Sequence, residues 1–293
     1  MLSEYLLSVV LGIVEGLTEF LPVSSTAHLR ISEALLGVSL SDPYWKMFTI
    51  AIQLGAVLCL PIYFRAPIAK LLASFPRGEQ GNRSILHHPV TLTLLAFAVT
   101  SALSLGLIKL VGKHLESLVV MGCALVLGGV VMWLVDALYA RSKLSTRTTE
   151  LEQMSPSQAL WIGACQTLSA VFPGTSRSMS TIAAGQLAGM TRASALEFSF
   201  FLSMPTMVAA TAYDVLKTVR HGAAPDASDS VHMTAHGWIL LALGFTVSFI
   251  VAYGVVAWFI RWVRSRGFVP FAIYRIIVGV AVLGWVVLGA APK

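Results

Sequence analysis

The sequence predicts an all-α integral membrane protein with six transmembrane helices and two re-entrant helical hairpins in an inverted-topology repeat. Three observations lead to this fold class. Of the 293 residues, 56% are hydrophobic and only 12% are charged, whereas about a quarter of the residues in a soluble domain are charged. Six segments are long and apolar enough to cross a bilayer. Two further apolar regions are each divided by a polar, proline-containing bend.

The six predicted transmembrane helices place the whole chain, residues 1–293, in a single polytopic membrane domain. They are Met47–Phe64, Val90–Ile108, Ser117–Val135, Phe198–Tyr213, Gly237–Ile260 and Phe268–Ala290. Cytoplasmic loops carry an excess of Lys and Arg, so we expect the more basic loops inside, namely Arg65–Pro89, Ala140–Pro156 and Arg261–Gly267. The loops expected outside are Lys109–Glu116 and Lys217–His236.

The formal net charge of +6 is spread over several loops and is not gathered on one stripe. A nucleic-acid-binding surface needs basic residues clustered on one face. We therefore expect membrane lipids, and no nucleic acid, among the partners. The three cysteines are far apart in apolar sequence, which argues against a disulfide framework.

Two apolar regions do not have the pattern of membrane spans, because a bend divides each into two short pieces. They are residues 5–37, with Pro22 in the bend, and residues 159–189, with Pro173. Non-helical backbone inside a bilayer is tolerated only where protein buries it or where it lines a wet cavity. We therefore expect two re-entrant hairpins whose bends meet inside the bundle, the first entering from outside and the second from the cytoplasm.

The two hairpins also resemble each other in sequence. A shift of 151 residues aligns Gly12 with Gly163, Glu15 with Gln166, Leu17 with Leu168, Pro22 with Pro173 and Ser25 with Ser176. Weak similarity between units of opposite orientation is typical of an inverted-topology repeat. The sequence predicts one repeat over approximately residues 1–138 and the other over approximately residues 157–290.

Two carboxylates precede the first bend. Glu15 and Glu19 are four residues apart, so they share one face of a helix. Carboxylates at membrane depth are costly unless a cation pairs with them, and hard divalent cations take oxygen ligands. The pair therefore predicts a metal site. The alternative is that the side chains reach the interface or pair with a lysine there.

Hydroxyl groups and a histidine follow the first bend. Ser24, Ser25 and Thr26 come directly after Pro22 and Val23, at a helix start where backbone N–H groups are free to bind an anion. Ser and Thr are also common helix caps. His28 fits a general acid or base, or a nucleophile; a structural role is the alternative.

The second bend has the composition of a phosphate cradle. It contains Gly174, Thr175, Ser176, Arg177 and Ser178. Arg offers planar bidentate donors, the hydroxyls donate further hydrogen bonds, and a helix N-terminus adds partial positive charge. A capped helix start with an interface-seeking Arg is the alternative, but an unpaired guanidinium in an apolar region is expensive.

Together these groups suit the hydrolysis of a phosphoanhydride on a membrane-borne substrate. A rival hypothesis comes from a different class of protein. Broken helices that meet at mid-membrane in an inverted repeat are also the architecture of secondary transporters. The same residues could then bind and carry an anionic isoprenyl lipid, as a transporter or flippase, without cleaving it.

The bend sequences resemble a known family. Residues Gly16–His28 (GLTEFLPVSSTAH) and Pro173–Ser178 (PGTSRS) look like the paired motifs of the BacA/UppP family of bacterial undecaprenyl-diphosphate phosphatases. Further similar segments are Ile52–Gly55, Glu197–Phe200 with Met204 and Pro205, and Pro270–Arg275, so that the likeness extends over nearly the whole chain.

The resemblance implies an enzyme, a hydrolase of the bacterial inner membrane. It implies removal of the terminal phosphate from the C55 isoprenyl diphosphate, undecaprenyl diphosphate, which recycles the lipid carrier for peptidoglycan synthesis and so for cell wall biogenesis and cell shape. It also implies dependence on a divalent cation, Mg²⁺ or Ca²⁺, and bacitracin resistance on overproduction. The oligomeric state stays open, with a homodimer as one candidate.

The family's functional residues can be carried over by position. Its acidic pair falls on Glu15 and Glu19, its Ser and His on Ser25 and His28, and its Arg on Arg177. The chain departs from the family pattern at two places. Ala27 stands where a Gly usually precedes the His, and Met179 where a Gly usually follows Ser-Arg-Ser. These departures concern loop details more than activity.

The sequence leaves the nucleophile and the side of catalysis open. Ser25 with His28 as base, His28 itself, or water could attack the phosphorus, and we favour Ser25 because a hydroxyl at a helix N-terminus is well placed against phosphate. The catalytic cavity is expected to open to the periplasmic side, because Glu15, Glu19 and His28 belong to the hairpin that enters from outside.

Overall fold

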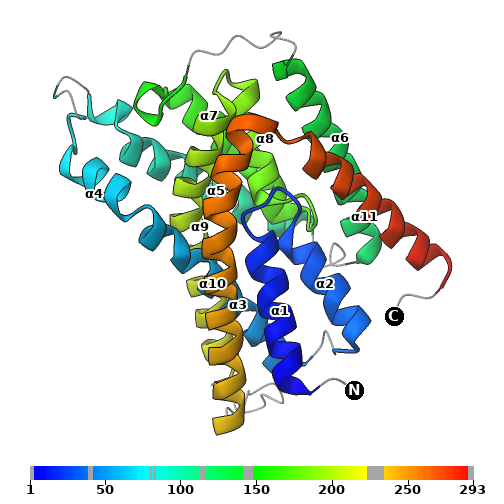
Figure 1. Cartoon of the computed structure of the whole chain (residues 1–293). Coiled ribbons are helices and arrows are strands. Elements are labelled where there is room, and N and C mark those ends of the chain that lie inside the picture. The colour runs from blue at the N-terminus through cyan, green and yellow to red at the C-terminus, as the bar shows by residue number, and fades with distance from the viewer. Residues whose placement is uncertain are drawn as a thin grey trace.

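The computed structural model describes residues 3–38, 42–78, 81, 84–111, 117–140, 148–222 and 234–289. Within these ranges the chain is almost entirely helical, and the only β pairing is an isolated bridge between Thr148 and Met190. The predicted all-α class is therefore confirmed for the described part of the chain. Figure 1 shows the helices as one elongated bundle, with α10 running along its length.

Among the described residues, six helices are long and apolar enough to cross a bilayer, and each overlaps one of the six predicted spans. Large apolar side chains point outward from them, such as Leu127 at 66% exposed and Ile277 at 62%. An apolar outer surface of this kind suits contact with lipid. The six helices are α3 (Pro43–Tyr63), α5 (Pro89–Val111), α6 (Leu118–Ala140), α9 (Arg192–Gly222), α10 (Ala235–Arg266) and α11 (Val269–Val287).

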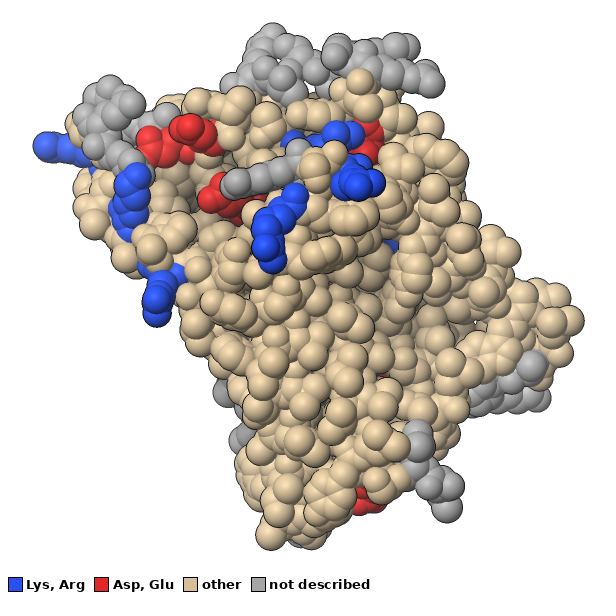
Figure 2. Space-filling view, viewed as in Figure 1, with Lys and Arg blue, Asp and Glu red and all other residues tan. Residues whose placement is uncertain are grey.

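On the face drawn in Figure 2, most of the visible Lys, Arg, Asp and Glu residues gather toward one end of the molecule, and the rest of that surface carries few of them. The C-terminal turns of α10 reach this end with Arg261 and Arg266. At the opposite end, the start of the chain and the start of α10 are joined by an ion pair between Glu4 and His236. Length, apolar surface and this distribution together make the chain a multi-pass membrane protein.

Each predicted hairpin is present as two helices on either side of a break. The first consists of α1 (Glu4–Thr18) and α2 (Ser25–Leu36), the second of α7 (Pro156–Val171) and α8 (Arg177–Leu187). At about 1.5 Å per residue, none of the four reaches the roughly 30 Å of a hydrocarbon core. Helix–break–helix geometry is thus observed in both regions, and their re-entry into a bilayer stays a prediction.

The helices pack in corresponding pairs. α1 packs against α10, and α7 packs against α5; α6 pairs with α11, and α3 with α9. The first two contacts depend on aligned glycines. A Cβ on Gly12 would lie 2.7 Å from the carbonyl oxygen of Gly244, and one on Gly163 would lie 2.5 Å from that of Ala96. This pairing supports the inverted repeat, whose boundaries at residues 1–138 and 157–290 stay predictions.

The two breaks match each other with a one-residue offset from the predicted alignment. Ser24 caps α2 with φ 76°, and Ser176 caps α8 with φ 71°. Ser24 and Ser176 are therefore equivalent, and Ser25 corresponds to Arg177. The second break contains one more residue between its proline and its cap, and Gly174 there has φ 94°, a conformation that glycine adopts without strain.

Two predicted loops are wrong in part. Residues 65–89 contain a short helix, α4 (Arg65–Ala73), and a 3₁₀ turn, η1 (Ile85–His87). Residues 261–266 are the end of α10, which stops only at Gly267 with φ 73°. Hydropathy marks where the apolar stretch ends, whereas a helix continues until a residue such as glycine ends it. The other three loops lie partly outside the described residues.

Candidate active site

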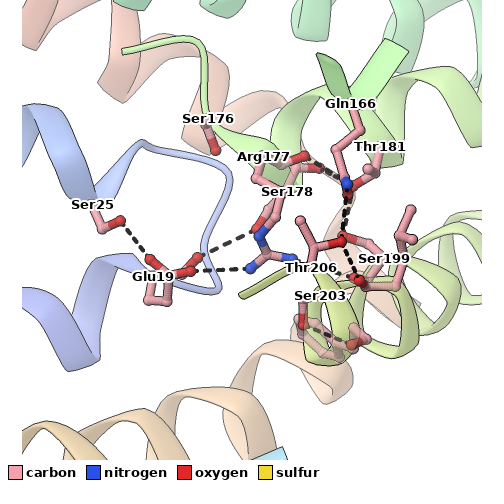
Figure 3. A network of polar contacts seen from close by, with 12 residues as sticks. Glu19, Ser25, Gln166, Ser176, Arg177, Ser178, Thr181, Ser199, Ser203 and Thr206 are labelled. Atoms are coloured by element: carbon pink, nitrogen blue, oxygen red, sulfur yellow. Dashed lines mark hydrogen bonds and ion pairs between the residues drawn. The ribbon is translucent and has the colours of Figure 1, made fainter. Parts of the chain in front are cut away.

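Glu19 joins the two breaks. It follows the last residue of α1, and its side chain is almost fully buried. Ser25 Oγ donates a hydrogen bond to Glu19 Oε2 at 2.6 Å, and Arg177 Nη2 donates to Glu19 Oε1 at 3.2 Å. Figure 3 shows Ser25 and Arg177 approaching this carboxylate from opposite sides. The first residues of α2 and α8 therefore meet on one carboxylate group.

The caps explain why these two side chains converge. Ser24 Oγ accepts a hydrogen bond from the Ala27 N–H, and Ser176 Oγ accepts one from the Met179 N–H. Both serines have positive φ, which turns the chain sharply into the helix that follows. The first N–H groups of a helix have no intrahelical partner, so two helix N-termini present donors and partial positive charge at the same place.

Helix α9 also binds Arg177, and further contacts hold the start of α8. Arg177 Nη1 donates to the Ser199 carbonyl oxygen of α9 at 3.3 Å. Thr181 Oγ1 donates to Ser199 Oγ at 2.7 Å, and Ser178 Oγ donates to the Glu19 carbonyl oxygen at 3.4 Å. Only 10% of the Arg177 side chain and 4% of that of Glu19 are exposed. The ion pair is therefore desolvated and held in a fixed geometry.

A cavity of about 200 Å³ lies between the breaks. Hydroxyl groups, one carboxylate and one guanidinium line it, and they come from both hairpins. Its polar lining residues are Glu19, Ser24, Ser25, Thr26, Gln53, Ser169, Ser176, Arg177 and Thr206. A larger hollow of about 610 Å³ between α6, α7 and α8 is lined almost wholly by apolar side chains. The smaller cavity is the one equipped to bind an anion.

Glu15 lies one turn before Glu19 and is completely buried. Neither of its carboxylate oxygens has a hydrogen-bond partner among the described residues. An orphaned carboxylate beside a second one fits a hard divalent cation, which prefers oxygen ligands. The described residues contain no cluster of three or more His, Cys, Asp or Glu suited to a metal. A Mg²⁺-like ion usually keeps waters and substrate phosphates beside one or two carboxylates, so the pair still fits.

His28 is held away from the Ser25–Glu19 contact. Its Nδ1 is 2.8 Å from the Ser24 carbonyl oxygen and its Nε2 is 2.8 Å from the Tyr274 hydroxyl. The two rings stack with centroids 5.5 Å apart. Both ring nitrogens therefore have partners, while the Ser25 hydroxyl donates to Glu19. The geometry favours Glu19, in place of the expected His28, as the proton acceptor for Ser25.

The other predicted site residues have different positions. Thr26 lines the polar cavity, and Ser178 reaches the Glu19 backbone. Thr175 lines the larger apolar hollow instead.

Sequence reasoning missed several groups at this site, including Gln53, Ser169 and Thr206 in the cavity lining and the buried Arg275. Arg275 of α11 donates to backbone carbonyls of both breaks. Its signal was an arginine inside a predicted transmembrane helix, which is a functional indication by itself.

Comparisons with known proteins identify the family of the chain. The family model described as "Bacitracin resistance protein BacA" matches residues 8–281. A protein of Koribacter versatilis named "Undecaprenyl-diphosphatase" is 64% identical over 285 residues, which cover 97% of this chain and 99% of that protein. Proteins of the same name from Bradyrhizobium sp. and Neisseria meningitidis serogroup C are 40% and 37% identical, each covering 95% of this chain and 96% of the relative. The chain belongs to the BacA family.

Proposed function

We propose that the chain is an undecaprenyl-diphosphatase, which hydrolyses a C55 isoprenyl diphosphate to the monophosphate and inorganic phosphate. The observation that carries this proposal is the contact of Ser25 and Arg177 with one buried carboxylate, Glu19. A hydroxyl, an acceptor for its proton and a guanidinium are the groups that phosphoryl transfer needs in one place. The relatives that carry this name match along almost the whole chain.

Ser25 is the nucleophile in this proposal. Its Oγ attacks the terminal phosphorus, its proton moves to Glu19, and the bond from that phosphorus to the bridging oxygen breaks. The bond electrons leave with the isoprenyl monophosphate, which takes up the proton from Glu19. Water then gives a proton to Glu19 as its oxygen attacks the phosphorus of the phosphoserine. The bond between that phosphorus and Ser25 Oγ breaks, and Glu19 returns the proton to Oγ, which releases inorganic phosphate and restores Ser25. The 2.6 Å hydrogen bond from Ser25 to Glu19 supports this assignment.

Arg177 and the two helix N-termini stabilise the negative charge of the transferring group. A preorganised donor in a dry site contributes much more than the same donor in water. The Ser199 carbonyl oxygen holds Arg177 in place, so little reorganisation is needed when the substrate binds. The hydroxyls of Ser24, Thr26 and Ser176 line the same cavity and would bind phosphate oxygens.

Glu15 and Glu19 would hold the divalent cation, Mg²⁺ or Ca²⁺, together with oxygens of the substrate. When bound, such an ion neutralises charge on the diphosphate and so favours departure of the monophosphate. The unpartnered, fully buried oxygens of Glu15 support this part of the proposal.

The proposed location is the bacterial inner membrane, with the cavity open to the periplasmic side. The gathering of charge at one end supports this orientation (Figure 2), since cytoplasmic ends carry more Lys and Arg. Single-cysteine variants lacking Cys59, Cys123 and Cys165 test it. An impermeant thiol reagent on intact cells should label positions in 217–236 and spare positions in 65–89; the reverse pattern would contradict the orientation.

A transporter or flippase of an anionic isoprenyl lipid is the second candidate, and the packing of α1 with α10 and of α7 with α5 favours it because transporters use paired broken helices. Phosphate release decides between the two. Detergent-purified protein with undecaprenyl diphosphate and Mg²⁺ should release phosphate, and EDTA should stop the release. Quenched samples should carry phosphate on Ser25 by mass spectrometry. No release with Mg²⁺, Ca²⁺ or Mn²⁺ would favour the transporter.

A further inference from the structure

Arg275 is a completely buried arginine in the middle of the molecule. Its Nη1 donates to the Pro22 carbonyl oxygen at 3.1 Å. Its Nη2 lies 3.1 Å from the Gly174 carbonyl oxygen and 3.0 Å from that of Thr175. A fourth acceptor, the Ala124 carbonyl oxygen of α6, is 3.1 Å away. One guanidinium therefore binds the backbone of both helix breaks.

A buried charge is expensive unless its surroundings compensate for it. The hydrogen-bond acceptors found for Arg275 are backbone carbonyls, and they lie on both hairpins and on α6. An apolar residue would be the cheaper choice if this position only filled space. The arrangement indicates that the charge is kept in order to hold carbonyl groups in one orientation.

The bonded carbonyls lie directly before the two helix caps. Pro22 is two residues before Ser24, and Thr175 is the residue before Ser176. The carbonyls of the breaks turn toward Arg275, and the helices that start after them direct Ser25 and Arg177 at Glu19. We propose that Arg275 is a positioning residue, which fixes both breaks so that the two helix N-termini face the substrate phosphates. This inference rests on the proposed phosphatase function for its kinetic consequence.

Gly128 of α6 makes room for this guanidinium. A Cβ added at Gly128 would collide with Nη2 of Arg275 and would lie 2.8 Å from Cε of Met179. The obstructing atom is the end of a flexible side chain, so Arg275 would move off its carbonyls while the helix stays intact. Gly128→Ala therefore displaces the guanidinium without removing its charge.

Gly122 offers a matched control on the same helix. Its added Cβ would lie 2.9 Å from Cδ2 of Leu283 and 3.3 Å from the Gly279 carbonyl oxygen, both on α11, and none of its three nearest atoms belongs to Arg275 or to a break. Gly122→Ala therefore produces similar crowding between α6 and α11 and leaves Arg275 in place. Arg275→Lys completes the set, because an ammonium group lacks the planar fork that reaches several carbonyls.

The test measures kinetics on undecaprenyl diphosphate and hydrogen–deuterium exchange in peptides that cover residues 19–28 and 172–181. Misplacement by about 1 Å can cost about 10²-fold in rate. We expect kcat to fall about 10²-fold in Arg275→Lys and about 10-fold in Gly128→Ala, with KM within about threefold, because the isoprenyl tail supplies most of the binding. Exchange should rise at both breaks in these two variants, and neither property should change in Gly122→Ala.

Each other outcome has a definite meaning. If hydrogen–deuterium exchange at either break is unchanged in both Arg275→Lys and Gly128→Ala, Arg275 does not fix both breaks, whatever the activity of these variants. Raised exchange with normal kcat would overturn the positioning role. If the unmodified protein releases no phosphate but the two variants still show raised exchange, the proposed phosphatase function is refuted, while the role of Arg275 in fixing both breaks is supported. Equal loss of kcat in Gly122→Ala would mean that general packing, and not Arg275, sets the rate.

Discussion

In the first break the chain turns at Ser24, with φ 76°, and begins α2 with Ser25; in the second it turns at Ser176, with φ 71°, and begins α8 with Arg177. The backbone geometry is the same, but the first position of the helix holds a hydroxyl in one case and a guanidinium in the other. Both side chains bind Glu19. Equal backbones facing each other can therefore place chemically different groups on two sides of one carboxylate.

The helices before the breaks show a second contrast. Glu15 and Gln166 are aligned, and both side chains are buried. Gln166 Nε2 donates to the hydroxyls of Thr100 and Thr206, each at 3.2 Å. Its Oε1 has no hydrogen-bond partner among the described residues, and for Glu15 this holds for both carboxyl oxygens. Buried polar groups are normally hydrogen-bonded. The amide of Gln166 is held by its neighbours, whereas the carboxyl group of Glu15 is available to the proposed cation.

The largest expected effect comes from Glu19, where the two breaks meet. Glu19→Gln keeps the shape but removes the proton acceptor for Ser25 and the charge opposite Arg177. We expect kcat for phosphate release to fall about 10³-fold, because a positioned base contributes about 10²–10⁴-fold. Glu33→Gln on α2 is the control, since Glu33 is also buried but pairs with Arg30. Normal turnover in Glu19→Gln would refute the assigned base.

Arg177→Lys tests whether the guanidinium of the second break does what its geometry suggests. Arg177 reaches the Glu19 carboxylate and the Ser199 carbonyl oxygen at once, and a lysine cannot reproduce this planar fork. We expect kcat to fall about 10²-fold, as for loss of one preorganised donor. Arg192→Lys is the control, since Arg192 pairs with Asp136 near the charged end. Equal losses in both variants would mean that arginine replacement itself harms the protein.

The sequence predicted the six spans because apolar length is sufficient to recognise a helix that crosses a bilayer. It also predicted both breaks, since Pro22 and Pro173 interrupt apolar stretches among hydroxyl residues. It could not predict that the Ser25 hydroxyl donates to Glu19 and not to His28. The direction of side chains at a break depends on which residue caps the helix with positive φ. Two serines follow Pro22, and nothing local indicates which of them is the cap.

Contacts across the chain were also beyond sequence reasoning. Glu19 and Arg177 are 158 residues apart, and their meeting depends on how the two hairpins pack. Arg275 was visible as a charge within an apolar helix, but its partners are backbone carbonyls, which every residue has. Helix α4 and the end of α10 were missed for a simpler reason, since hydropathy does not reveal a helix in polar sequence.

Exchanging the aligned pair Glu15 and Gln166 should affect metal dependence more than maximal rate. For Glu15→Gln we expect the Mg²⁺ concentration at half-maximal activity to rise at least about tenfold, since even outer-sphere partners change metal affinity by that factor. Thermal stability in EDTA should rise, because an unpaired buried carboxylate is replaced by a neutral amide. Unchanged Mg²⁺ dependence in Glu15→Gln would refute the metal site.

Gln166→Glu is the converse change, and its effect should be on stability. It places a carboxylate where Thr100 and Thr206 accept hydrogen bonds from the amide. We expect a loss of about 1–3 kcal/mol in thermal or denaturant unfolding, with unchanged Mg²⁺ dependence. A stable Gln166→Glu protein with altered Mg²⁺ dependence would mean that the two positions are not chemically distinct.

The smallest expected effects on activity come from substitutions of Gly12 and Gly163, which lie in the helices that precede the two breaks. Gly12 and Gly163 each bring a broken helix against the backbone of a long helix, α10 or α5. If the two contacts are equivalent, Gly12→Ala and Gly163→Ala should destabilise the protein equally, by about 1–3 kcal/mol as for overpacking, and kcat in the folded fraction should change little. Gly254→Ala is the control, because its Cβ would meet nothing within 4 Å. If one variant loses much more unfolding free energy than the other, the two contacts are not equivalent, and the two halves of the chain contribute differently to stability although their folds correspond.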